Sequence, residues 1–168
     1  MKAHFGKDKT FVVGNIGNPY TLEADKTSKD SVTVGEISSF QLETIHTFHP
    51  VVSAILNITP DHLNRHHTME AYVAAKEAVA SQQTKADICV LNYDNDYTRD
   101  FAGRCPATPV LFSSHHELEN GYFLRGDKII KSVNGEEHEL MDIHKDMNLV
   151  GLCNVENVMA AIAIAEGM

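Results

Sequence analysis

The sequence has few cysteines and no long apolar segment, and both features restrict the class of protein to which it can belong. Its three cysteines, Cys89, Cys105 and Cys153, are odd in number and widely spaced, which disfavours a disulfide framework and indicates a reducing compartment. The first residues lack the apolar core of a secretory signal peptide. No apolar run approaches the roughly 18 residues that cross a bilayer. We therefore expect a cytoplasmic protein without membrane insertion.

Basic residues are scarce as well: 14 Lys and Arg stand against 23 Asp and Glu, for a net charge of −9. This balance argues against a general nucleic-acid binder, which must neutralise many phosphates. It remains compatible with a nucleotide ligand, because backbone amides and a metal ion hold phosphates on acidic proteins. Two histidine pairs, His66-His67 and His115-His116, lack a cysteine or carboxylate at metal-binding spacing, so we expect no dedicated zinc site.

The pattern of apolar residues predicts an α/β fold in a chain of 168 residues, which is long enough for one domain with a core. Strands and helices alternate up to about residue 113, and three short strands joined by tight turns follow. We expect a doubly wound, mainly parallel sheet with a small antiparallel appendage. The expected strands are Thr10–Val13, Ser31–Ile37, Val51–Ile58, Asp87–Leu91, Val110–Ser113, Tyr122–Leu124, Lys128–Lys131 and Glu137–Leu140, and the expected helices are about fifteen residues after an N-cap at Thr68, then Tyr97–Ala102 and Asn154–Glu166.

Two of the expected strands end abruptly in polar side chains. Ser31–Ile37 carries Glu36 at its end, and Val51–Ile58 is followed by Asp61 and His62. Ligands of open parallel sheets bind outside the carboxyl ends of the strands. We therefore expect these two strands to be inner neighbours, with Glu36 and His62 at one edge of the sheet, as a metal-assisted phosphate site requires.

Each candidate residue also has an explanation without function. The helix after Thr68 places Tyr72 and Lys76 on one face, at i and i+4, and Lys76 is then an ordinary surface lysine. Glu36 is then a solvated strand end, and Asp61 and His62 are an N-cap and a partly buried imidazole. Arg65 either binds a phosphate or forms an ion pair with Glu70. The residues that are then helix caps are Ser38, Ser39, Asn154 and Asn157.

The order and spacing of these segments resemble the central domain of the Mur ligases, the ATP-dependent amide-forming enzymes of peptidoglycan synthesis. The resemblance covers essentially the whole chain. The form Glu-Ile-Ser-Ser-Phe-Gln-Leu-Glu at Glu36–Glu43 is most similar to the branch that adds D-glutamate to UDP-N-acetylmuramoyl-L-alanine. The matching segments are Gly14–Gly17, Glu36–Glu43, Asn57–Arg65, Tyr72–Lys76 and Asn154–Asn157.

The resemblance implies ATP and Mg²⁺ as cofactors, and UDP-N-acetylmuramoyl-L-alanine and D-glutamate as the other substrates. Glu36 would bind one Mg²⁺, and His62 would hold a second together with a carbamate formed by CO₂ on Lys76, so that His62 and Lys76 are catalytic. Carbamylation turns the lysine from a cation into an anion. The implied substrate-binding residues are Asn15, Ser38 and Gln41, and the implied nucleotide-binding residues are Asn154 and Asn157.

Several departures from the family pattern bear on activity. The phosphate-binding loop and its strand would lie upstream of Gly14, so we expect residues 1–168 to be a partial central domain, without the N-terminal UDP-binding and C-terminal domains and inactive alone. Asn64 stands where an Asp is common, and Cys153 where a His usually precedes the first Asn. The alternatives are another Mur ligase, a folylpolyglutamate synthase-like ligase, or a non-catalytic module that binds UDP-muramoyl peptides.

Overall fold

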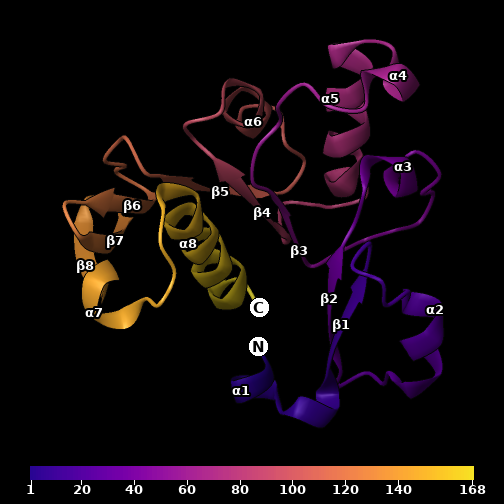
Figure 1. Cartoon of the computed structure of the whole chain (residues 1–168), viewed down its shortest axis with the longest axis horizontal. Coiled ribbons are helices and arrows are strands. Elements are labelled where there is room, and N and C mark those ends of the chain that lie inside the picture. Colours follow the sequence, from indigo (N-terminus) through magenta and orange to yellow (C-terminus); the bar gives the residue numbers. More distant parts are fainter. The chain divides into compact units, whose positions relative to one another are not determined.

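The computed structural model describes residues 1–168, except for the side chains of residues 2 and 3. The chain divides into two compact units, residues 1–45 and 46–168, each with its own sheet (Figure 1). Among the described residues, no helix combines the length and the apolar character needed to cross a membrane.

The smaller unit is built around a two-stranded parallel sheet, in which Thr10 lies opposite Val32 and Gly14 opposite Glu36. The expected strand ranges are confirmed to within two residues. Val13 and Val32 are buried, and short helical segments surround the pair. The elements of this unit are α1 (Lys2–Phe5), β1 (Thr10–Gly14), α2 (Tyr20–Glu23), β2 (Val32–Glu36) and α3 (Ser39–Leu42), with 3₁₀ turns at Lys7–Lys9 and Ala24–Lys26.

The larger unit is built around a six-stranded sheet in the order β3-β4-β5-β6-β7-β8. The first four strands are parallel, and the last two pairings are antiparallel, which confirms the predicted appendage. The strands are β3 (Val52–Ile55), β4 (Ile88–Asn92), β5 (Thr108–Ser113), β6 (Gly121–Arg125), β7 (Lys128–Val133) and β8 (Glu136–Asp142), and the helices are α4 (Leu63–His66), α5 (Met69–Glu77), α6 (Asp96–Ala102), α7 (Ile143–Asp146) and α8 (Leu152–Glu166).

Helices cover both faces of this sheet, because alternate side chains of its central strand point to opposite sides. Cys89 and Leu91 of β4 belong to an apolar cluster with residues of α5 and α6. Val90 belongs to a second cluster with Val155 and Met159 of α8, the long helix of Figure 1. The larger unit is therefore a three-layer α/β structure, as the alternation of elements predicts.

One sequence-based expectation about the strands is wrong, and a second stays a prediction. The expected strand Val51–Ile58 is shorter, because the ladder with β4 ends at Ile55. Ile58 is nevertheless buried, and its carbonyl oxygen accepts a 3.0 Å hydrogen bond from Asn95 Nδ2. The expected pairing of β2 with β3 is also not seen among the described strands, where β2 pairs with β1 and β3 with β4. Apolar periodicity shows which face of a strand is buried, not which strand lies beside it.

Candidate functional site

The carboxyl ends of β1 and β2 bring Asn15 and Glu36 together. The Asn15 backbone N–H donates to the Glu36 carbonyl oxygen over 2.8 Å. The Asn15 side-chain Nδ2 donates to Glu36 Oε1 over 3.3 Å. These contacts follow from the register of the parallel pair, which places Gly14 opposite Glu36. An exposed carboxylate held beside an amide is suited to a hard cation such as Mg²⁺, which needs only one or two protein carboxylates.

Gly14 makes this close approach possible. Its φ is 111°, and a Cβ added there would lie 2.0 Å from the Glu36 carbonyl oxygen. Neither the backbone conformation nor the space accepts a side chain at this position.

We expect Gly14→Ala to separate the ends of β1 and β2 and to destabilise the smaller unit by about 2 kcal/mol or more. Gly17→Ala is the matched control, since Gly17 also has a positive φ, 83°, but an added Cβ would meet nothing within 4 Å. The free energy of unfolding of both variants is measured by urea denaturation monitored by circular dichroism. If Gly14→Ala and Gly17→Ala lose the same free energy of unfolding, the close approach of Gly14 to Glu36 adds nothing to the cost of the strained backbone.

Ser38 and Gln41 form a capping box at the start of α3. Gln41 N donates to Ser38 Oγ over 3.3 Å, and Gln41 Oε1 accepts from Ser38 N over 2.9 Å. The capping role considered for Ser38 is therefore confirmed, and Ser39 is buried in the first turn. The box fixes the conformation of the chain directly after Glu36. The expected role of Ser38 and Gln41 in substrate binding stays a prediction.

His62 lies before α4 in the left-handed region, with a φ of 54°. Asp61 Oδ1 accepts the His62 backbone N–H over 2.7 Å, and Asp61 Oδ2 lies 3.4 Å from His62 Nε2. A positive φ is uncommon outside glycine and costs on the order of 1–3 kcal/mol, so such strain is frequently found at functional positions. The carboxylate of Asp61 holds the imidazole in this conformation.

Lys76 lies half-buried on α5, which begins after the predicted N-cap Thr68. Its Nζ lies 5.2 Å from the centroid of the Tyr72 ring, which confirms that these two residues share a face. The Tyr72 ring is in turn 5.2 Å from the His66 ring.

Asn154 and Asn157 both lie on the first turns of α8, as predicted, but Asn154 is not the N-cap. The helix begins after Gly151, whose φ is 103°. Asn154 therefore lies inside the first turn, where its Nδ2 donates to the Val150 carbonyl oxygen over 2.7 Å. Glycine adopts this backbone conformation without strain, which shifts the start of the helix toward the N-terminus. The side chain of Asn157 is exposed.

The predicted residues divide between the two units. Asn15, Glu36, Ser38 and Gln41 lie in the smaller unit, and the larger unit holds the other predicted residues, His62, Lys76, Asn154 and Asn157. A shared edge for Glu36 and His62, and a common metal for His62 and Lys76, stay predictions.

The structure brings His115 close to two carboxylates that the spacing in the sequence did not indicate. Ligand atoms of Asp94, His115 and Glu156 lie within 4.8 Å of one another. The three residues are remote in sequence and come together only because β4, β5 and α8 are neighbours, so no local spacing reveals them. Asn95, in the same turn after β4 as Asp94, caps α6 by accepting a hydrogen bond from Thr98 N over 3.3 Å.

Comparison with known proteins identifies close relatives of the sequence. The family model described as the Mur ligase middle domain matches residues 3–165. The UDP-N-acetylmuramoylalanine–D-glutamate ligase of Lachnospira eligens is 57% identical over 159 residues, which are 95% of this chain and 35% of that protein. The ligase of the same name from Clostridioides difficile is 48% identical over 160 residues, again 95% and 35% of the two chains. The chain therefore spans about a third of the length of these relatives.

Solved structures agree with this fold. MurF from Acinetobacter baumannii superposes with a TM-score of 0.66 at 14% identity, over 96% of this chain and 37% of that one. The MurF ligase of Thermotoga maritima, solved in complex with ADP, gives a TM-score of 0.61 at 15% identity, over 95% of this chain and 39% of that one. At such identities the likeness concerns the fold alone, and it confirms the predicted α/β class with its antiparallel strands.

Proposed function

The chain belongs to the Mur ligase family, and we propose that it is the middle, ATP-binding domain of a cytoplasmic UDP-N-acetylmuramoylalanine–D-glutamate ligase. The observation that carries this proposal is the 57% identity to a ligase of that name over 95% of the chain. The segment Glu36–Glu43 supports the D-glutamate-adding branch in particular. The free thiols of Cys89, Cys105 and Cys153 suit a reducing cytoplasm.

The proposed reaction activates the carboxylate of UDP-N-acetylmuramoyl-L-alanine as an acyl phosphate, at the expense of ATP. The amine of D-glutamate then attacks the acyl carbon, an amide forms and phosphate leaves. The transferred phosphoryl group develops negative charge on its oxygens, so catalysis depends on positioning and on charge neutralisation. Mg²⁺, when bound, supplies that neutralisation.

The residues of the smaller unit suit metal and substrate binding. Glu36 presents an exposed carboxylate, and the 3.3 Å contact from Asn15 Nδ2 leaves its second oxygen for a cation. In the proposal, Glu36 binds Mg²⁺, while Asn15, Ser38 and Gln41 bind the UDP-muramoyl substrate. The capping box supports this role because it sets Ser38 and Gln41 in one rigid turn directly after the metal ligand.

The residues of the larger unit suit a second metal ion and the nucleotide. His62, held by Asp61, and a carbamate on Lys76 are proposed ligands of a second Mg²⁺. A carbamate supplies the anionic oxygen that Mg²⁺ prefers, whereas an ammonium would be repelled. Asn157, exposed on the first turns of α8, is proposed to contact the adenine through its amide, with Asn154 beside it.

A domain replacement tests this function. In the Lachnospira eligens ligase, the segment that aligns with this chain would be exchanged for the chain itself, and ADP release would be measured. We expect ADP formation that requires both UDP-N-acetylmuramoyl-L-alanine and D-glutamate. The same chimera carrying Glu36→Gln should lose ADP formation while circular dichroism shows that it is folded.

Two results would contradict the proposal. A folded chimera that uses another amino acid in place of D-glutamate would assign the chain to a different ligase. A folded chimera that binds the UDP-muramoyl substrate without releasing ADP would indicate a non-catalytic binding module.

A further inference from the structure

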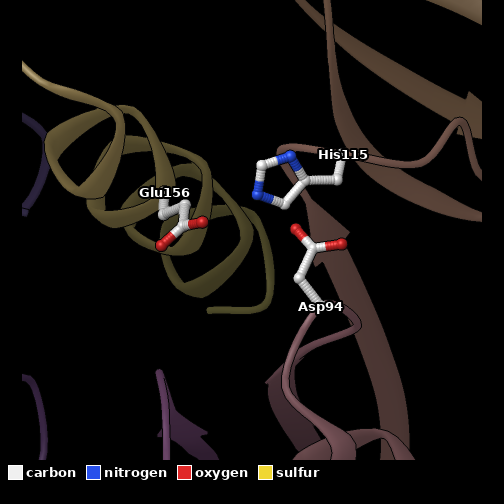
Figure 2. A group of neighbouring side chains, drawn as sticks. All are labelled: Asp94, His115 and Glu156. Carbon is white, nitrogen blue, oxygen red and sulfur yellow. The ribbon is translucent and has the colours of Figure 1, made fainter.

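Three potential metal ligands converge at the carboxyl ends of β4 and β5, and none of them is among the residues assigned above, although Glu156 adjoins Asn157 in the chain. Asp94 follows β4, His115 follows β5, and Glu156 lies in the first turns of α8. One ligand atom from each lies within 4.8 Å of the other two (Figure 2). In Figure 2 the His115 imidazole lies between the two carboxylates, so an ion placed among them would contact one group from each of three elements.

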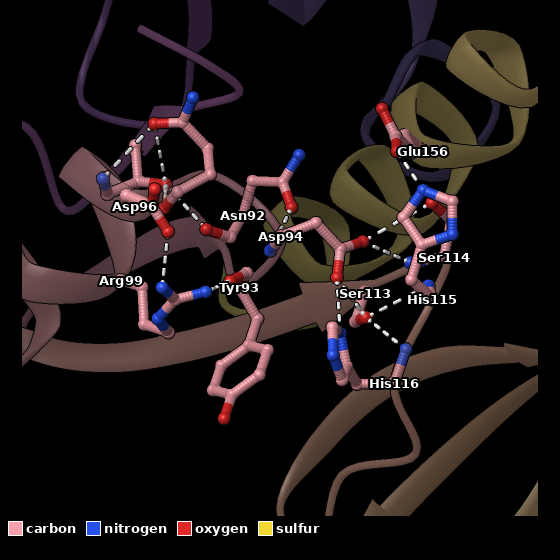
Figure 3. Close-up of polar contacts among 12 residues, drawn as sticks. Asn92, Tyr93, Asp94, Asp96, Arg99, Ser113, Ser114, His115, His116 and Glu156 are labelled. Atoms are coloured by element: carbon pink, nitrogen blue, oxygen red, sulfur yellow. Dashed lines mark hydrogen bonds and ion pairs between the residues drawn. The ribbon is translucent and has the colours of Figure 1, made fainter.

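Asp94 is held in place by its surroundings. Its side chain is only 9% exposed. Oδ1 accepts hydrogen bonds from Ser113 Oγ over 2.6 Å and His116 Nδ1 over 2.9 Å, and Oδ2 accepts from Ser114 N over 2.7 Å (Figure 3). Hydrogen-bonded neighbours of this kind orient metal-binding carboxylates and reduce the entropy lost on binding.

Ser114 links the two carboxylates through a single hydroxyl group. Its Oγ lies 2.6 Å from Glu156 Oε1 and 3.3 Å from Asp94 Oδ2. One hydroxyl hydrogen serves only one of these acceptors at a time. The described residues provide no hydrogen bond to Glu156 Oε2 or to either ring nitrogen of His115, so these atoms are available to a ligand.

The charge of the cluster favours a cation. Two carboxylates face the imidazoles of His115 and His116, and no Lys or Arg among the described residues forms an ion pair with Asp94 or Glu156. Repulsion between neighbouring carboxylates is relieved when a divalent ion binds both.

We propose that Asp94, His115 and Glu156 bind one divalent transition-metal ion, with Zn²⁺ as the best match, and that the ion fastens the start of α8 to the ends of β4 and β5. One imidazole and two carboxylates form the mixed nitrogen and oxygen set that suits Zn²⁺, whereas Mg²⁺ binds mainly oxygen ligands. Ligand bonds to Zn²⁺ are about 2.0–2.2 Å long, so the donor atoms must draw closer on binding. The exposed His115 ring can make that movement.

The test measures Zn²⁺ binding to this chain by competition with a chromophoric chelator. All proteins would carry Cys153→Ser, because Cys153 is an exposed free thiol and thiolates are zinc ligands. We expect one equivalent to bind, with affinity at least about tenfold weaker in His115→Ala and in Glu156→Gln. The control is His138→Ala, an exposed histidine whose only recorded partner in the described structure is Glu136 at 3.8 Å, and it should change affinity less than about twofold.

A second readout reports the ligands directly. Co²⁺ in place of Zn²⁺ should give visible absorption bands that His115→Ala abolishes, and Zn²⁺ should raise the melting temperature of the parent protein but not of His115→Ala. Glu156→Gln conserves side-chain size, so its loss of affinity is not a folding defect if its melting temperature without metal equals that of the parent. Equal affinities in the parent protein, His115→Ala and Glu156→Gln would overturn the proposal, as would the absence of a saturable equivalent.

Discussion

Lys76→Ala, introduced into the chimeric ligase, is expected to lower the rate of ADP formation by about 10³-fold or more. The proposed carbamate on Lys76 is an anionic ligand for a metal beside the transferred phosphate, and loss of a preorganised charge of this kind costs about 10²–10³-fold or more in rate. In the structure Lys76 is half-buried on α5, and its Nζ lies 5.2 Å from the Tyr72 ring centroid.

Two further variants separate a carbamate from an ordinary lysine. Lys76→Arg keeps a positive charge but cannot form the carbamate, so it should be as inactive as Lys76→Ala. A short carboxylic acid added to Lys76→Ala should partly restore the rate, because it returns an anionic oxygen to the site. Lys29→Ala, at an exposed position, is the matched control and should retain the parent rate.

The alternative is a surface lysine that only packs on Tyr72, where a cation–π contact contributes about 0.5–1 kcal/mol of stability. In that case Lys76→Ala would keep the parent rate and lose only a little stability. Parent rates in both Lys76 variants would remove Lys76 from the proposed mechanism.

Phe112→Ala is expected to reduce the free energy of unfolding of the larger unit by about 3–5 kcal/mol. Phe112 lies on β5 with no exposed surface, in the cluster that joins the sheet to Val155 and Met159 of α8. Loss of the ring would leave a cavity directly under the helix that carries Asn154 and Asn157. Phe112→Leu fills most of the space and should cost about 1.5 kcal/mol or less.

Urea denaturation monitored by circular dichroism measures these changes. Phe48→Ala is the control, since Phe48 is 36% exposed and belongs to neither apolar cluster of the described residues. We expect Phe48→Ala to cost less than about 1 kcal/mol. If Phe112→Ala costs no more than Phe48→Ala, the cluster between β5 and α8 is not a principal source of stability in this unit.

The sequence by itself determined the features that depend on neighbouring residues. Alternating apolar side chains predicted the strands, and the helix that follows Thr68 begins at Met69 with its first turn capped by that hydroxyl. Turn residues predicted the antiparallel strands after Gly121. The motifs around Glu36, His62 and Asn154 indicated the family, because each motif is a continuous stretch of chain. All of these are local properties, encoded within a few residues of one another.

Only the tertiary structure decided which distant residues meet. The pairing of β2 with β1, the 2.0 Å approach that requires glycine at position 14 and the convergence of Asp94, His115 and Glu156 all join segments far apart in the chain. The periodicity of a strand indicates which of its side chains are buried, but it does not indicate which strand pairs with it. That pairing depends on the order of all the strands in the sheet. Through that order His115 lies beside Asp94 and Glu156, which are 21 and 41 residues away in the chain.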